Sequence, residues 1–372
     1  MNPSKVLRVL ASMTMVICLT FLFSACEGPE GPAGQDGAAG AVGPVGPKGD
    51  KGDKGDPGDP GADGTAGCIT CHDMSTDLVA RLDQWQNSQH NMGGNFERNG
   101  QGCNECHTHE GFREFIATGA VAAPPANPTA IGCRTCHNIH TTYGEADYSL
   151  AVSGPTAFRA GYIASAPAYD KGASNLCVTC HQPRQVAPFP TVGGDDVTIT
   201  SSRYGPHHGP QGSLLVGVAG YEVPGSMPYN NSPHANIASG CIQCHMATPF
   251  GRQSGGHTMR LAYDYHGSEV PNMAGCASCH SSATDFDVNG GQTAVLALAA
   301  QLEALLKADN ILQLDDQGNP TGLNNTPLTL TANKAGALYN WKMIVVEDRS
   351  KGVHNPSYAK ALLQNSIDNY NN

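Results

Sequence analysis

The residues of this chain that can do chemistry are cysteines and histidines, and most of them occur in one repeated pattern. Cys-x-x-Cys-His is found six times in the 372 residues. This pattern is typical of covalent haem c attachment, because the two thiols add to the haem vinyl groups and the adjacent imidazole ligates the iron. A zinc site or a redox dithiol, the alternatives for a lone Cys-x-x-Cys, does not require a histidine after every cysteine pair.

The motifs therefore predict six covalent haems c as cofactors. The predicted thioether cysteines are Cys68, Cys71, Cys103, Cys106, Cys133, Cys136, Cys177, Cys180, Cys241, Cys244, Cys276 and Cys279. The predicted proximal iron ligands are His72, His107, His137, His181, His245 and His280.

Nine histidines lie outside the motifs, and six of them would suffice to give every iron a second imidazole ligand. His140 follows His137 by three residues and cannot easily reach the opposite face of the same haem, so we expect it to ligate a neighbour. His207 and His208 are adjacent, and we expect one of them to bind iron. We expect His109 and His266 to be non-ligands. The remaining distal candidates are His90, His140, His207, His208, His234, His257 and His354.

Several stretches between Cys68 and Ile367 resemble the multihaem cytochrome c group of nitrite reductase, hydroxylamine oxidoreductase and octahaem tetrathionate reductase. These are Trp85 to His90, Leu176 to Gln182, Gly255-Gly256-His257-Thr258 and Gly352-Val353-His354-Asn355-Pro356. The resemblance implies that His90, His234, His257 and His354 are distal ligands. The chain departs from these enzymes in having six motifs and no Cys-x-x-Cys-Lys, the motif of the lysine-ligated catalytic haem in the commonest nitrite reductases.

The N-terminus has the features of a signal peptide over residues 1–25. Lys5 and Arg8 precede an apolar run from Val9 to Phe23, which is short for a membrane span. The sequence up to Cys26 resembles a bacterial lipobox, which implies lipidation of Cys26; simple secretion is the alternative. Removing Cys18 with the signal and lipidating Cys26 leaves twelve cysteines, all of them in the six motifs.

Residues 26–67 hold the anchoring cysteine and a predicted collagen-like stalk, because glycine recurs at every third position from Gly28 to Gly67. Strict G-X-Y spacing is the collagen signature, since only glycine fits at the axis of three wound chains. A flexible Gly/Pro linker has no reason to keep this register. The stalk allows a homotrimer.

We expect residues 68–372 to form a hexahaem cytochrome c domain with a helical C-terminal part, residues 286–372. The predicted fold is mainly α and irregular coil wrapped around a closely spaced multihaem stack. With only 6% aromatic residues the chain has few large apolar side chains, so we expect the haems to form its core. Helices are predicted over residues 293–308, 335–346 and 357–367, and Val295, Leu298, Leu302 and Leu305 share a face of the first. No stretch of alternating apolar and polar residues is long enough to predict a β-sheet.

The predicted function is electron transfer by a non-enzymatic carrier or conduit on the outer membrane or cell surface. Its expected partners are redox proteins or an extracellular acceptor, with the lipid anchor in the membrane. The net charge of −11 argues against nucleic acid. The alternative is a respiratory oxidoreductase acting on a small nitrogen or sulfur species at one five-coordinate haem. A purely structural surface fibre explains the stalk and leaves the six motifs unexplained.

Overall fold

The computed structural model describes residues 72, 76–93, 95–207, 209–324 and 326–372. The predicted signal peptide, Cys26, the stalk to residue 67, Cys68, Cys71 and His208 lie outside the described residues. The chain divides into two units, residues 1–60 and 61–372, and all the elements below belong to the second unit.

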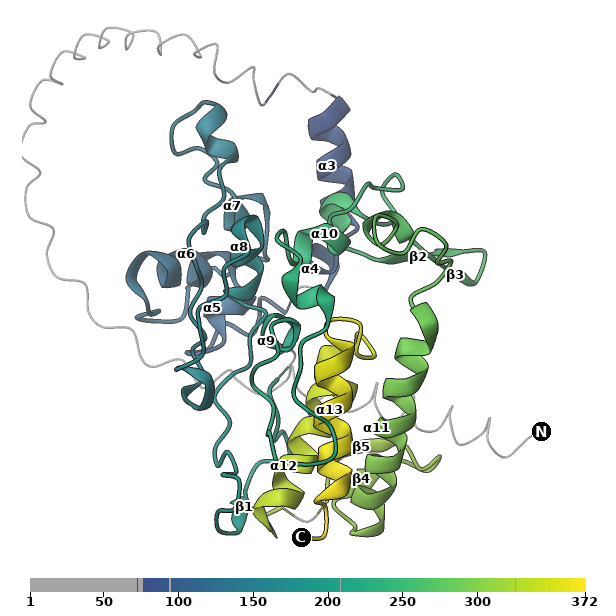
Figure 1. Cartoon of the computed structure of the whole chain (residues 1–372). Helices are drawn as coiled ribbons and strands as arrows, with labels where there is room; N and C mark the ends of the chain where they lie inside the picture. Colours follow the sequence, from purple (N-terminus) through teal and green to yellow (C-terminus); the bar gives the residue numbers. More distant parts are fainter. Residues whose placement is uncertain (1–71, 73–75, 94, 208, 325) are drawn as a thin grey trace, which may run out of the picture. The chain divides into compact units, whose positions relative to one another are not determined.

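The first two thirds of this unit consist of short helices joined by long irregular segments (Figure 1). The α-helices are α3 (Thr76–Gln86), α4 (Gln89–Met92), α5 (Asn104–His107), α6 (His109–Thr118), α7 (Cys133–Cys136), α8 (Asn175–Val178), α9 (Gln211–Leu215) and α10 (Cys241–His245). Short 3₁₀ turns are η1 (Glu145–Tyr148), η2 (Gly161–Ile163), η3 (Gly172–Ser174), η4 (Pro233–Asn236), η5 (Gly256–Thr258), η6 (Met273–Gly275) and η7 (Val288–Gly290).

Local sequence signals explain where α6 begins and ends. The side chain of Thr108 accepts a hydrogen bond from the backbone N–H of Gly111 and so caps the first turn. At the other end Gly119 adopts a left-handed conformation with φ of 81°, which a residue without Cβ reaches at no steric cost. The segment between them is therefore a short, well-defined helix directly after the second motif.

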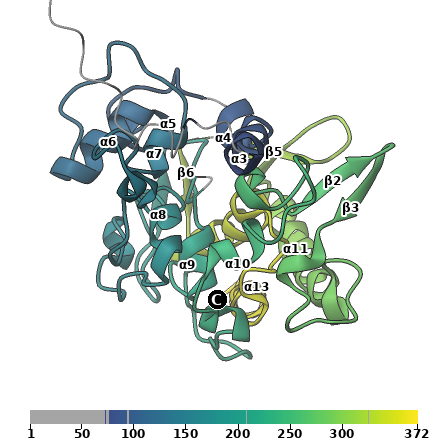
Figure 2. The same cartoon turned by 90° about the horizontal axis from the view of Figure 1, so that it is seen from above.

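Three longer helices form the C-terminal part and lie against one another (Figure 1), and Figure 2 shows α11 and α13 side by side from above. They are α11 (Gly291–Ala308), α12 (Ala332–Trp341) and α13 (Pro356–Asp368); α12 continues as a π-helix, η8 (Lys342–Asp348). All three predicted helices are present; the end of the first is as predicted, and the other bounds are shifted by one to five residues. Val295 and Leu302 of α11 are buried, whereas Leu298 and Leu305 are only partly so.

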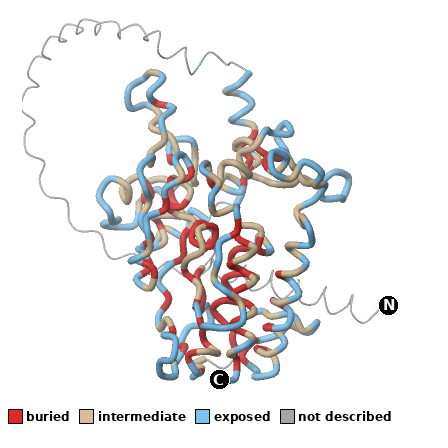
Figure 3. The backbone as a smooth tube through the Cα atoms, in the orientation of Figure 1, coloured by how far each residue is buried: buried red, intermediate tan, exposed pale blue. Residues whose placement is uncertain are grey.

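The protein also has a side-chain core, which the low aromatic content did not predict. Buried residues gather along α12, α13 and the irregular segments beside them (Figure 3). Tyr339, Leu338, Tyr358 and Leu362 are at most 1% exposed and belong to one hydrophobic cluster that extends back to Phe158. Because this cluster is concentrated in the C-terminal helices and residues 158–223, average composition concealed it.

Strands are few and short, so the fold is mixed helix and coil. Three antiparallel two-stranded ladders pair β1 (Val197–Ile199) with β6 (Leu328–Leu330), β2 (Ala262–Tyr265) with β3 (Ser268–Pro271), and β4 (Leu312–Leu314) with β5 (Pro320–Leu323). Strands of three or four residues are too short to produce a recognisable alternation. Within the described residues, no helix has both the length and the apolar character needed to cross a membrane.

Candidate metal centres

Among the residues that the structure describes, twelve histidine rings face one another as six pairs, and each pair joins one motif histidine to one histidine outside the motifs. The ring centroids in each pair are 6.0–6.5 Å apart. The pairs are His72–His140, His107–His207, His137–His257, His181–His90, His245–His354 and His280–His234.

This separation matches two imidazoles on opposite sides of one metal ion. A metal–imidazole bond is about 2 Å, and the ring centroid lies roughly 1 Å behind the ligating nitrogen, so two such rings have centroids about 6 Å apart. All six pairs fall within half an ångström of that value. The interplanar angles vary from 20° to 83°, as expected if distance rather than mutual orientation is what the pairs share.

Each described motif forms one turn, and that turn fixes how its side chains point. The backbone N–H of the motif histidine bonds to the carbonyl of the first cysteine, for example His181 to Cys177 at 2.9 Å and His280 to Cys276 at 2.8 Å. Residues three and four apart lie on the same face of a helical turn. The two cysteines and the histidine of a motif are thus presented together. The ten described cysteines form no disulfide.

The second ring nitrogen, Nδ1, is held by neighbouring groups in several of the paired histidines. Backbone carbonyls contact Nδ1 of His137, His234 and His245, at 2.8, 2.6 and 3.0 Å. The side-chain oxygen of Gln211 lies 3.2 Å from Nδ1 of His181. Such contacts orient the ring and leave Nε2 to face the partner imidazole.

Met259 lies between two of the pairs. Its sulfur is 3.0 Å from Nδ1 of His90, and its carbonyl oxygen is the one that holds His245. Burial, together with the nearby His181 and His245 rings, lowers the pKa of His90 to about 4. His90 is therefore a neutral imidazole at physiological pH, the form that ligates metals. Sequence reasoning gave no signal for the role of Met259.

The pair of His245 and His354 has a buried carboxylate next to it. Nδ1 of His354 lies 2.6 Å from Oδ1 of Asp348, whose side chain is 0% exposed. Burial alone would lower the pKa of His354, but the charge of Asp348 and the hydrogen bond to it give a net increase. No motif or spacing in the sequence indicates Asp348 either.

Two of the paired histidines have strained backbones. His140 and His207 adopt positive φ angles of 63° and 57°, which non-glycine residues rarely do. The loop that holds His140 is closed by Asp147, whose carboxylate accepts hydrogen bonds from the backbone N–H groups of His140 and Thr142, both at 2.7 Å. The fold therefore stabilises a conformation that brings His140 to His72.

Cysteines of different motifs also contact one another. A hydrogen bond with Cys180 is the main reason that the pKa of Cys106 falls to about 7, against the effect of burial. A hydrogen bond with Cys177 likewise lowers the pKa of Cys241 to about 5. These contacts make the fourth motif a neighbour of the second and of the fifth.

The histidines that we expected to be non-ligands lie outside the six pairs. Nδ1 of His109 contacts the hydroxyl of Thr135 at 3.0 Å, and exposed His266 packs edge-on against Tyr265. Of the adjacent histidines, His207 is in a pair and His208 lies outside the described residues. The structure thus brings six distal candidates to motif histidines, including His140 to the first motif.

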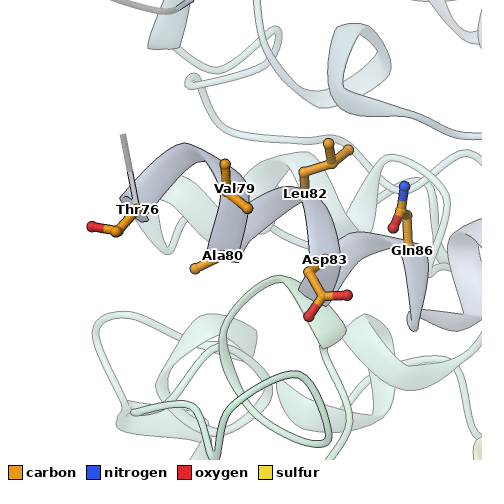
Figure 4. A pocket seen from close by; sticks show the side chains of 6 residues that line it. All are labelled: Thr76, Val79, Ala80, Leu82, Asp83 and Gln86. Carbon is orange, nitrogen blue, oxygen red and sulfur yellow. The ribbon is translucent and has the colours of Figure 1, made fainter. Parts of the chain in front are cut away.

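Each pair offers two imidazole rings and no further side-chain ligand from the described residues. Among the residues that the structure describes, no group of three or more His, Cys, Asp or Glu side chains is arranged to hold a metal ion. A shallow hollow on α3 contains neither histidine nor cysteine (Figure 4). It is lined by Thr76, Val79, Ala80, Leu82, Asp83 and Gln86.

Comparison with known proteins identifies the N-terminal segment. The family model described as collagen triple helix repeat (20 copies) matches residues 25–69, and this agrees with the glycine register. Neither the curated proteins nor the solved structures contain a match to the chain.

Proposed function

We propose that the protein is a hexahaem c-type cytochrome that transfers electrons, with every iron ligated by two histidines. The observation that carries the proposal is the set of six histidine pairs, each with one member from a Cys-x-x-Cys-His motif. Two protein ligands on opposite sides leave four equatorial positions to be supplied by the cofactor. A haem supplies four nitrogens in that plane, and its vinyl groups account for the two cysteines in the sequence of each motif.

A partly buried arginine supports the same cofactor. In the described part of the chain, Nε of Arg260 is buried without a hydrogen-bond partner, in the segment that also holds His257 and Met259. A buried N–H donor left unpaired is costly, and a carboxylate is the best partner for a guanidinium. Haem propionates are carboxylates, so Arg260 is the residue that we assign to binding one of them.

Two histidines per iron favour a conduit over an enzyme. When bound, the haems supply six one-electron carriers, and double histidine ligation leaves no open iron position for substrate. The contacts of Cys180 with Cys106 and of Cys177 with Cys241 hold the fourth motif close to the second and the fifth, and electron transfer requires such closeness between centres. An oxidoreductase would need one site without a second imidazole.

The collagen repeat and the N-terminal pattern suggest where the conduit works. We propose that residues 1–25 are removed on export, that Cys26 is lipidated in the outer membrane, and that the repeat projects the cytochrome from the surface. The repeat also provides for a homotrimer, because collagen winds three chains. The electron acceptor would then be a redox protein or an extracellular compound.

Three measurements on the mature protein test the central proposal. Mass spectrometry should find six haems that resist acid-acetone extraction, and Cys276→Ser should impair attachment at one site. Electron paramagnetic resonance (EPR) of the oxidised protein should count six low-spin haems, and carbon monoxide should not bind. Fewer than six haems after competent maturation would contradict the cytochrome proposal. One high-spin haem that binds carbon monoxide would replace the conduit with the oxidoreductase.

A further inference from the structure

Asp348 and the turn that follows it form a rigid support for His354. The side chain of Asp348 is fully buried at the end of η8, and its ion-pair partner in the described residues is His354, at 2.6 Å. Its second oxygen accepts hydrogen bonds from the backbone N–H and the hydroxyl of Ser350. The Ser350 hydroxyl also accepts a hydrogen bond from the backbone N–H of His354 at 3.3 Å.

The turn has little freedom to move. Arg349, Lys351 and Gly352 all have positive φ angles, of 60°, 55° and 87°. A Cβ at Gly352 would lie 2.7 Å from Val295 of α11, so the turn packs tightly against that helix. This geometry holds the carboxylate of Asp348 at 2.6 Å from Nδ1 of His354. The ring of His354 faces that of His245, with 6.2 Å between the ring centroids.

We propose that Asp348 is a positioning residue that lowers the reduction potential of the haem between His245 and His354. The inference rests on the proposed function. A carboxylate that accepts the Nδ1–H bond makes the imidazole a stronger donor through Nε2, and the stronger donor favours ferric over ferrous iron. A buried negative charge acts in the same direction, because it favours the more positive oxidation state and is weakly screened.

Comparison with the partner ring shows why the effect is local. Nδ1 of His245 contacts the neutral carbonyl of Met259, and Nδ1 of His181, in the adjacent pair, contacts the neutral amide of Gln211. These acceptors carry no charge, so they transfer less electron density to the ligating nitrogen than a carboxylate does. The carboxylate at His354 thus distinguishes this centre from its neighbour.

The test is Asp348→Asn in the full-length holoprotein, which keeps the shape and the acceptor oxygen but removes the charge. Redox titration by visible absorbance, with EPR of each poised sample, should show one haem with a raised midpoint and all six still low-spin. We expect a roughly tenfold change in the oxidised-to-reduced ratio of that haem at fixed potential, about 59 mV for a one-electron couple. Asp348→Glu, which keeps the charge, should keep the midpoint of that haem close to the wild-type value.

Asp368→Asn is the matched control, because Asp368 also accepts bonds from the N–H and hydroxyl of a serine, Ser226, but contacts no histidine. It should leave all six midpoints unchanged. A second variant, Ser350→Ala, removes a hydroxyl that draws charge away from the carboxylate. We therefore expect the midpoint of the same haem to fall, with a change of about threefold in its oxidised-to-reduced ratio at fixed potential. This variant decides the matter if Asp348→Asn does not fold.

Two results would overturn the inference while leaving the proposed function intact. One is an Asp348→Asn protein that keeps six low-spin haems and has the same six midpoint potentials as the Asp368→Asn control. The other is a midpoint in Ser350→Ala that is unchanged or raised. A wild-type protein with fewer than six haems would instead contradict the proposed function itself, so the two failures are distinguishable.

Discussion

Removing His257 tests the assignment of the histidine pairs directly. Its ring lies 6.3 Å from that of His137, between centroids. Its backbone N–H is bonded to the side chain of Gln84 at 3.0 Å, and that bond survives any change of side chain. His257→Ala should therefore remove one iron ligand and leave the local backbone in place.

The expected magnitude follows from the number of pairs. One haem in six should change from low to high spin, so the low-spin EPR signal should fall by about one sixth while six haems remain attached. The variant should bind one carbon monoxide per chain. Added imidazole should restore the low-spin signal, because the vacated space has the size of that ring. We expect a loss of about 1 kcal/mol in stability, typical of a single substitution that is not in the core.

His266→Ala is the matched control, since His266 is exposed on the β2–β3 hairpin and outside the pairs. It should keep six low-spin haems and bind no carbon monoxide. The pair assignment is refuted if His257→Ala also keeps six low-spin haems, or if both variants lose the same fraction of the signal.

Further predictions concern a neighbouring contact, the core and the anchor. Met259→Leu removes the sulfur next to His90 but preserves the side-chain volume and the backbone carbonyl that holds His245. Redox titration should therefore show one haem with a shifted midpoint potential. Thermal melting should show a change in the free energy of unfolding below about 1.5 kcal/mol. Gly336→Ala should destabilise the protein by about 1–3 kcal/mol in denaturant unfolding, because the added Cβ would lie 2.0 Å from the ring of Tyr221. An unchanged denaturant concentration at the unfolding midpoint would contradict the packing of α12. Cys26→Ala should release the protein from the membrane fraction, and unchanged fractionation would favour another tether.

The elements that carry strong local patterns could be predicted from the sequence, and the partners that meet only in the folded chain could not. The motifs, the collagen register and the three C-terminal helices rest on spacing, which the sequence contains. In the structure His109 lies outside the six pairs and His140 faces His72; whether either ligates iron stays a prediction. Asp348 and Met259 act through contacts across the fold and occupy no motif, so nothing in the local sequence indicates them.

The side-chain core was missed for a related reason. Composition averages over the whole chain, whereas the large apolar residues of this protein are concentrated in two regions, residues 158–223 and 291–370. The π-helix after α12 was also not predicted. It begins at buried Lys342 and ends at Asp348, and nothing in the periodicity of that segment separates it from an ordinary helix.

The pairs also have a topological consequence, because their members are far apart in the chain. The separation ranges from 46 residues, for His234 and His280, to 120 residues, for His137 and His257. Each iron would therefore close a loop, and the loops starting at His90, His107 and His137 interleave. Closing one such loop shortens the free stretch of chain that the next loop must close. The entropic cost of closure is smaller for a shorter stretch. Cofactor loading should accordingly be cooperative, with chains that carry two or three ligated irons scarce beside empty and full ones.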